Sequence, residues 1–160
     1  MKNSAKGNMY EATLEETREL FAPYLEGAPS GVVCVVAART LGDQARGALE
    51  SSAAALGYGR SCCMYATLRP VHAEDDAALD SQALFLLMEG LDPLVVVAAD
   101  AEAARALGGA YRQDVPVDAP CRLFGRDAVA FASFEGMLDD PQSKQTAWAL
   151  LKKLPRFGER

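Results

Sequence analysis

The sequence predicts an α/β fold, a three-layer α/β/α sandwich around a central, mostly parallel, four-stranded sheet. Short valine-rich apolar runs at 32–36 and 94–98 are typical of strands covered on both faces. Ala-rich segments with helix-start and helix-end signals follow these runs. Because strands that alternate with helices at this spacing pair in parallel through right-handed crossovers, we expect helices on both faces of the sheet.

The N-terminal third contains a first helix, the expected central strand and a second helix. Thr13 with Glu16 forms a capping-box pattern, so we expect the first helix to begin there. The β-branched run at 32–36 is the expected central strand. Residues 43–56 have the composition of a helix packed closely on a sheet, and Gly57 ends this helix because glycine readily adopts positive φ.

The remaining elements continue the alternation of strands and helices. We expect strands at 61–67 and 94–98, helices at 73–91, 101–107 and 141–154, and a hairpin with strands at 121–124 and 128–132. Asp75 or Asp76 lies near the start of the long helix, and Asp100 is placed to cap the short one. Asp140 and Pro141 supply an N-cap followed by proline at the first helical position.

The composition favours one acidic domain. The chain has 160 residues, of which 50% are hydrophobic, and a formal net charge of -6. We expect a single domain over residues 1–160, with flexible ends at about 1–10 and 156–160. The basic residues are scattered, which opposes nucleic-acid binding. No apolar run reaches the roughly 18 residues that span a bilayer, so we expect a cytoplasmic protein without membrane contact.

The cysteines are expected to be reduced and buried. They occur at 34, 62, 63 and 121, form no C-x-x-C pair, and are accompanied by a single histidine, His72. The first three fall in apolar, strand-like runs, where a thiol packs as a small hydrophobic group. Disulfides or a metal site are the alternative. The sequence therefore predicts no metal and no cofactor.

A candidate cleft lies at the carboxyl ends of the predicted strands, because open α/β sheets bind ligands where the strand order reverses. Its polar residues are Arg39, Thr40, Asp43, Arg69, Asp100, Ser133 and Glu135. Segment 37–43 contains one glycine, too few for a phosphate-binding Rossmann or P-loop turn. Arg39 and Thr40 would still bind an anion at the helix N-terminus, unless they belong to a solvated loop.

Each chemical role at this cleft has a structural alternative. Ser133 would need an adjacent base to act as a nucleophile, and otherwise it closes the last strand. Asp100 and Glu135 would form a carboxylate pair if their strand ends adjoin, whereas Asp100 also fits a helix N-cap. His72, which precedes three carboxylates, is either a general base or an exposed loop residue. We assign no catalytic residue.

Three segments, in order, carry a family resemblance. The first is Tyr65 to Pro70, which a long helix follows. The second reads Gly90-Leu91-Asp92-Pro93-Leu94-Val95-Val96-Val97-Ala98 and leads into the Ala-rich helix that ends at Gly108. The third runs from Ala130 to Leu138 and is followed by Asp140-Pro141 and Trp148. In this order they resemble the uracil-DNA glycosylase superfamily, especially its shorter bacterial branch, over residues 30–155.

The loops depart from that family. Ser133 stands where the family has the histidine of a His-Pro-Ser loop, and Met64 falls near its uracil-reading asparagine. Residues 37–43 replace a water-activating loop similar to Gly-Glu-Ala-Pro-Gly, and the cysteine spacing of the family's iron-sulfur cluster is missing. Base excision needs polar groups around an extruded base and its departing charge. The resemblance therefore implies the fold without glycosylase activity.

The expected function is that of a bacterial, uracil-DNA glycosylase-like pseudoenzyme that acts as a protein-interaction or scaffold module. A small accessory subunit of the bacterial clamp loader is similar in architecture and gives a precedent for such a role. The alternative is an enzyme, or a small-ligand or nucleotide-binding protein of altered specificity, that uses the candidate cleft. True uracil excision is the third hypothesis, and the missing loops oppose it.

Overall fold

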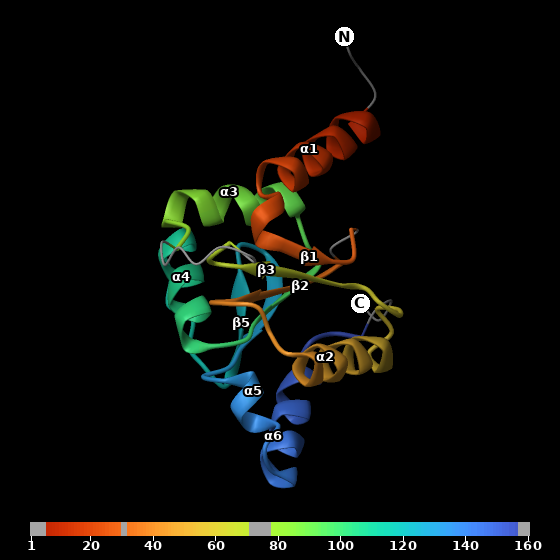
Figure 1. Ribbon diagram of the computed structural model, residues 1–160, viewed down its shortest axis with the longest axis vertical. Helices are drawn as coiled ribbons and strands as arrows, with labels where there is room; N and C mark the ends of the chain where they lie inside the picture. The colour runs from red at the N-terminus through yellow and green to blue at the C-terminus, as the bar shows by residue number, and fades with distance from the viewer. Residues whose placement is uncertain (1–5, 30–31, 71–77, 157–160) are drawn as a thin grey trace.

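A mixed, six-stranded sheet forms the centre of the molecule (Figure 1). The computed structural model describes residues 6–29, 32–70 and 78–156, with side chains from Thr13 onward. The strands are β1 (Leu25–Gly27), β2 (Val33–Ala37), β3 (Cys63–Thr67), β4 (Val95–Ala98), β5 (Ala119–Leu123) and β6 (Arg126–Ala130). They lie in the order β1-β3-β2-β4-β6-β5. The four inner strands run parallel, and the two edge strands pair antiparallel.

Helices cover both faces of the sheet. They are α1 (Lys6–Leu20), α2 (Asp43–Ala55), α3 (Ser81–Leu91), α4 (Ala101–Tyr111), α5 (Phe134–Met137) and α6 (Pro141–Leu151), with a short 3-10 turn, η1 (Ala22–Tyr24), after α1. The helices α2, α5 and α6 pack on one face, and α1, α3 and α4 pack on the other (Figure 1). The predicted α/β fold, with a mostly parallel sheet between helices, is confirmed.

Each face of the inner strands has its own apolar core. Val35 and Val97 pack with residues of α2 and α6, whereas their neighbours Val36 and Val96 pack with residues of α3 and α4. Successive strand residues alternate between the faces, so a strand covered on both sides needs an unbroken apolar run. Every residue of β2, β3 and β4 is buried. Burial of each large apolar side chain stabilises the fold by about 1.5–3 kcal/mol.

The sheet has six strands, where the sequence predicts four. The four parallel strands were expected, and the edges are β5, which was expected as one strand of the hairpin, and β1, which was not expected. Strand β1 has three residues, none of them buried, and β5 contains Pro120 and alternates between exposed and partly buried positions up to its last residue, Leu123, which is buried. Edge strands tolerate proline and need no apolar run, because one side makes no ladder hydrogen bonds. The predicted hairpin is confirmed as β5 and β6.

Helix α1 begins earlier than the capping-box pattern predicts. Its first residue is Lys6, so Thr13 lies inside the helix and is not its N-cap. The carbonyl of Thr13 accepts a hydrogen bond from Thr17 Oγ1 at 2.8 Å. The prediction of flexible ends falls partly on residues 1–5 and 157–160, which lie outside the described residues.

Helix α3 begins later than predicted. Asp80 is its N-cap, with Oδ1 accepting a hydrogen bond from the Ala83 N–H at 2.8 Å. The acidic residues that were expected to start this helix lie within 71–77, outside the described residues. Helix α4 in turn passes through the glycines expected to end it and ends at Tyr111. Gly108 leaves room for the Gln113 carbonyl, 2.9 Å from where a Cβ would lie.

The cysteines are free thiols. Cys34, Cys62 and Cys63 are buried, as the apolar runs predict, and Cys121 is partly buried. Among the residues that the structure describes, no helix is both long and apolar enough to span a membrane.

Candidate functional site

The carboxyl edge of the sheet is formed by the loops that follow β2, β3, β4 and β6. The chain leaves β2 through α2 on one face and leaves β4 through α4 on the other, so the strand order reverses between these two strands. Open α/β sheets form binding sites at such a point. The residues of the predicted cleft lie in these loops or in the first turns of the helices that follow them: Arg39, Thr40, Asp43, Arg69, Asp100, Ser133 and Glu135.

Asp100 links the two loops on either side of the reversal point. Its Oδ1 accepts a hydrogen bond from the Ala103 N–H at 2.8 Å, which caps α4. Its Oδ2 accepts a hydrogen bond from the Ala38 N–H, in the loop after β2, at 2.9 Å. The N-cap role is confirmed, and the second contact closes the backbone across the point where a ligand of this fold would enter.

Glu135 lies at the N-terminus of α2, where the sequence allows an anion site. Its Oε2 accepts a hydrogen bond from the N–H of Gly42, the N-cap residue of α2, at 2.7 Å. Gly42 has no side chain to cap the helix, and a helix N-terminus attracts negative charge. The protein's own carboxylate therefore stands where an external anion would bind.

Ser133 acts as a helix cap. Its Oγ accepts a hydrogen bond from the Gly136 N–H at 3.1 Å and begins α5. The next residue, Phe134, donates its N–H to the Ala99 carbonyl at 2.8 Å and buries its ring against Phe131, with ring centroids 5.1 Å apart. These contacts support the structural interpretation of Ser133, since its hydroxyl oxygen already accepts a hydrogen bond within the chain.

Arg69 pairs with a carboxylate that the sequence reasoning did not single out. Its Nη2 lies 2.7 Å from Glu102 Oε2, and its Nη1 donates to the Ala38 carbonyl at 3.5 Å. The hydrogen bond from Arg69 lowers the pKa of Glu102 below its usual range against the opposing effect of burial, and the charges of Arg69, Arg105 and Arg39 lower it further. Three guanidinium groups thus act on one carboxylate at this edge.

The other predicted residues do not complete a catalytic group. Thr40 and Asp43 are exposed, and Asp43 lies in the first turn of α2. His72 lies outside the described residues. The structure brings the predicted cleft residues to one edge, but Asp100, Glu135 and Ser133 accept hydrogen bonds from backbone amides, and Arg69 contacts Glu102. Their polar atoms hold the loops of the edge together.

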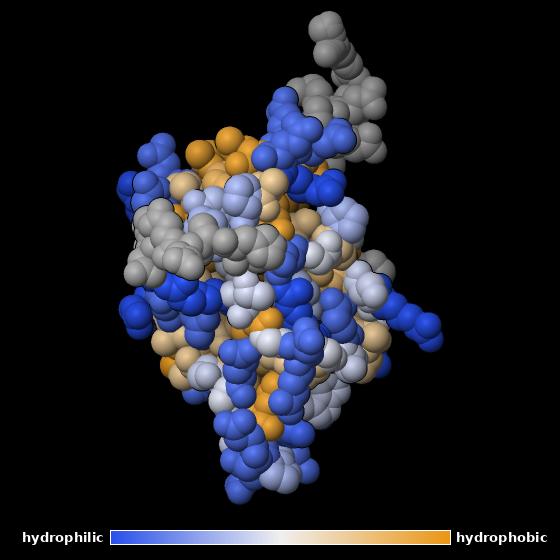
Figure 2. Space-filling view, viewed as in Figure 1, coloured by the Kyte–Doolittle hydropathy of each residue, from blue (hydrophilic) through white to orange (hydrophobic). Residues whose placement is uncertain are grey.

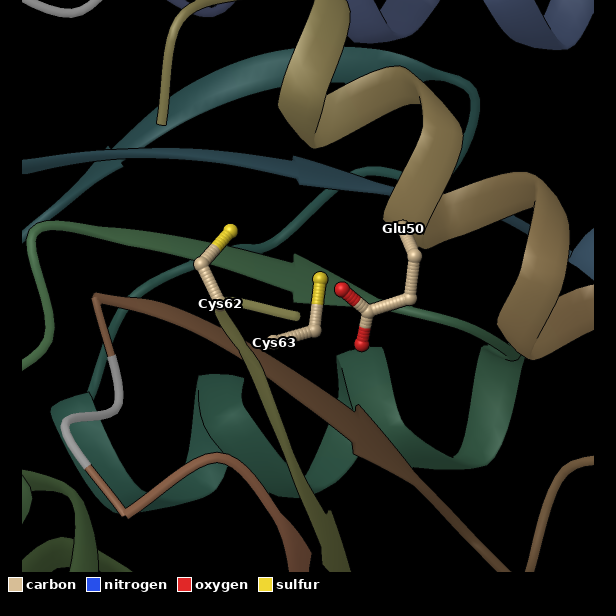
Figure 3. A group of neighbouring side chains, drawn as sticks. All are labelled: Glu50, Cys62 and Cys63. Carbon is tan, nitrogen blue, oxygen red and sulfur yellow. The ribbon is translucent and has the colours of Figure 1, made fainter. Parts of the chain in front are cut away.

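A second polar group, the thiol–carboxylate cluster, consists of Glu50, Cys62 and Cys63 (Figure 3). One potential ligand atom from each residue lies within 4.8 Å of the others. Burial, reinforced by the charge of Glu50, raises the pKa of both thiols. Glu50 Oε2 accepts a hydrogen bond from Tyr65 Oη at 3.0 Å, whereas Glu50 Oε1 is buried and accepts none from the described residues.

An aromatic groove, lined by Phe85, Tyr111 and Phe124, lies between α3, α4 and the tip of the β5–β6 hairpin. Its volume is about 550 Å³, and Arg112 lies on its wall. The ring centroids lie 5.2 Å (Phe85–Tyr111), 6.2 Å (Phe85–Phe124) and 6.0 Å (Tyr111–Phe124) apart. Phe124 is 69% exposed and has a φ of 50°, a left-handed conformation that costs a bulky residue about 1–2 kcal/mol.

Neither of these two groups follows from sequence patterns alone. The adjacent cysteines look like core residues, and nothing in the local pattern brings Glu50 of α2 to them. The aromatic groove has one local signal, the bulky Phe124 before Gly125 in a hairpin turn, where small and polar residues are usual.

The chain matches no protein-family model. A search of curated proteins also gives no match. The resemblance to the glycosylase superfamily therefore continues to rest on the residues that carry it.

Proposed function

We propose that this chain is a uracil-DNA glycosylase-like domain without glycosylase activity that acts by binding another protein through the aromatic groove. The observation that carries this proposal is a contrast between two surfaces. The polar groups of the carboxyl edge are bonded within the chain, whereas Phe124 is exposed in an unfavourable backbone conformation. A strained, exposed aromatic residue is a reason to suspect a binding role.

The positions that would carry uracil excision support the absence of that activity. Met64, near the family's uracil-reading asparagine, is 2% exposed and packs in the core on the side of α3 and α4. Its thioether provides none of the amide hydrogen bonds that identify a base. Ser133 replaces the expected histidine and caps α5, and Glu135 occupies the N-terminus of α2 beside the loop at 37–43. Because a thioether, a capping hydroxyl and a carboxylate stand at these places, the departing uracil anion gains little stabilisation.

The surface around α3 supports protein binding. Leu86, on the outside of α3, is 54% exposed, and Leu20 at the end of α1 is 71% exposed. A second hollow of about 370 Å³, lined in part by these two side chains, lies on the other side of α3 from the aromatic groove. Figure 2 shows hydrophobic residues gathered over α3, next to the hydrophilic surface of α1. Contiguous apolar surface of this kind marks protein interaction sites.

The shape and charge of the groove indicate the kind of partner. Three aromatic rings offer a pocket for an apolar or aromatic side chain, the type of anchor that dominates binding energy at interfaces. The guanidinium of Arg112 beside them suits a carboxylate. We infer a partner protein that presents an apolar side chain flanked by an acidic residue, such as one face of an amphipathic helix.

One observation favours the alternative, a ligand-binding protein that uses the carboxyl edge. Arg39, Arg69 and Arg105 act on Glu102 and make this part of the edge positive. Asp100 and Glu135 oppose it, because both place negative charge on the amides that would otherwise bind an anion. A ligand at the edge would have to displace these carboxylates, whereas a partner bound at the aromatic groove would not.

The test compares two substitutions of exposed apolar residues. Phe124→Glu places a charge in the aromatic groove, and Val117→Glu is a matched control at an apolar residue that is 40% exposed on the connector before β5. The full chain and both variants, verified as folded by circular dichroism, are used as bait in native lysate. Loss of a hot-spot residue costs about 2 kcal/mol or more, so we expect at least about 30-fold weaker capture by Phe124→Glu alone.

The same partner should be retained by the wild type and by Val117→Glu, in a fixed stoichiometry. Equal capture by both variants, or a chain that stays without any stoichiometric partner, contradicts protein binding through the aromatic groove. A separate assay tests the lack of catalysis. Cleavage of uracil-containing single-stranded DNA above a no-protein control would show that the excision activity is present.

A further inference from the structure

We propose that the thiol–carboxylate cluster, Glu50, Cys62 and Cys63, binds a zinc ion. The site lies between α2 and β3, on a different part of the molecule from the aromatic groove (Figure 3). It goes beyond the proposed protein-binding function and does not depend on it. The sequence patterns predict buried core thiols and no metal, whereas the arrangement of the side chains in space supports a metal site.

The backbone before β3 directs both thiols to the same side of the sheet. Adjacent residues of a regular strand point to opposite faces. Ser61, however, has a left-handed conformation with a φ of 49°, and β3 begins only at Cys63. Cys62 therefore does not follow the strand alternation, and both cysteines belong to the apolar core under α2. In Figure 3 the two sulfur atoms lie side by side.

Glu50 completes a set of three ligands. It extends from α2 toward the sulfur of Cys63 (Figure 3), and the three ligand atoms lie within 4.8 Å of one another. In a tetrahedral zinc site, bond lengths of about 2.3 Å to sulfur and 2.0–2.2 Å to oxygen place the ligand atoms about 3.4–3.8 Å apart. A bound ion would draw the three ligand atoms together to these distances.

The carboxylate of Glu50 is arranged like a metal ligand. Oε1 is buried and has no hydrogen-bond partner among the described residues, as is also true of Arg46 Nε one turn earlier in α2, and an unpaired buried oxygen is unfavourable for a carboxylate. A metal ion would satisfy this atom. Oε2 accepts a hydrogen bond from Tyr65 Oη at 3.0 Å. Zinc ligands commonly have such a second partner, which fixes the orientation of the ligand group.

The chemistry of the ligands selects zinc. Magnesium and calcium prefer sites made entirely of oxygen, and copper(I) prefers sulfur without carboxylate. Zinc accepts thiolate and carboxylate together, and three protein ligands leave a fourth position for water. Two thiolates and one carboxylate carry more negative charge than the ion neutralises. Arg46, whose guanidinium lies 4.7 Å from the centre of the Tyr65 ring and pairs with Glu26, lies close to this charge.

The experiment titrates the full, reduced chain with cobalt(II) as a spectroscopic substitute, followed by displacement with zinc. Two thiolate ligands should give sulfur-to-cobalt charge-transfer absorption at one ion per chain. Cys62→Ser with Cys63→Ser should abolish this absorption. Cys121→Ser, which removes a partly buried thiol outside the cluster, is the matched control and should keep it. Glu50→Gln should weaken zinc affinity, measured by competition with a chromophoric chelator, at least about 10-fold.

Tyr65→Phe separates metal binding from packing, because it removes only the hydroxyl, which contacts Glu50 at 3.0 Å and the Arg46 carbonyl at 3.4 Å. It should lower zinc affinity about 10-fold while circular dichroism stays unchanged. If the double cysteine variant fails to fold, Glu50→Gln and Tyr65→Phe decide the result. The proposal is wrong if charge transfer is absent, if it survives loss of both cysteines, if Cys121→Ser removes it, or if neither Glu50→Gln nor Tyr65→Phe changes zinc affinity.

Discussion

The carboxyl edge and the thiol–carboxylate cluster both bring polar side chains together from separate elements, but the hydrogen bonds of their carboxylates differ. At the carboxyl edge, both oxygens of Asp100 accept backbone N–H groups, and Glu135 accepts another. In the cluster, one oxygen of Glu50 is buried without a partner in the described chain. A polar group with its hydrogen bonds made supports the scaffold, whereas a buried group that lacks one indicates a ligand.

The largest expected effect comes from Asp100→Ala. The change leaves the N–H groups of Ala103 and Ala38 without their acceptors, so we expect a loss of about 3 kcal/mol in the free energy of unfolding. Urea unfolding of the purified chain measures it. Asp80→Ala removes only the α3 cap and should cost about 1 kcal/mol. Equal losses in the two variants would mean that the Ala38 contact contributes nothing.

The next effect tests whether Glu135 replaces an external anion. Glu135→Ala removes the carboxylate at the N-terminus of α2 and should cost about 1 kcal/mol at low salt. The vacated N-terminus should then bind sulfate, so sulfate should raise the melting temperature of this variant more than that of the wild type. Glu135→Gln, which keeps an acceptor for Gly42 but no charge, is the control. An identical sulfate response in the wild type and Glu135→Ala would contradict the anion role.

The smallest effect is a pH dependence at Glu102. Arg69 lowers the pKa of this carboxyl from its ordinary value of 4.5, so its stabilising contribution is complete above that pH and is lost as the pH falls through the lower, folded-state value. For a surface ion pair we expect about 0.5 kcal/mol. The stability difference between the wild type and Glu102→Gln should therefore shrink in acid. Glu15→Gln, an exposed change in α1, serves as the control. A difference that stays constant with pH would exclude the ion pair as its source.

The parts of the fold that were predictable are those with local signals. Unbroken apolar runs revealed β2 and β4, and Asp140 caps α6 as predicted, with Oδ1 accepting the Ser143 N–H at 2.7 Å. The edge strand β1 was missed because three partly exposed residues form no pattern. At Thr13 the sequence predicted a helix start that the structure does not have. Thr13 and Glu16 lie inside α1, because these residue types also occur in the interior of helices.

The candidate sites were less predictable, because their contacts join distant parts of the chain. The sequence places Asp100 and Glu135 at the carboxyl edge, but their partners Ala38 and Gly42 lie 62 and 93 positions away. Likewise, the common direction of Cys62 and Cys63 depends on the left-handed backbone of Ser61, which no residue type in this segment demands. Predicting either arrangement requires the loops in three dimensions.

The central claim is that the carboxyl edge is closed by the chain's own side chains. The most direct measurement follows the backbone amide signals of Ala38, Gly42 and Gly136 by NMR while a uracil-containing single-stranded oligonucleotide is added to the full chain. These amides donate to Asp100, Glu135 and Ser133, so a ligand at the edge has to displace those contacts. Unchanged signals at all three amides are the predicted result, and saturable shifts of these three would contradict the claim.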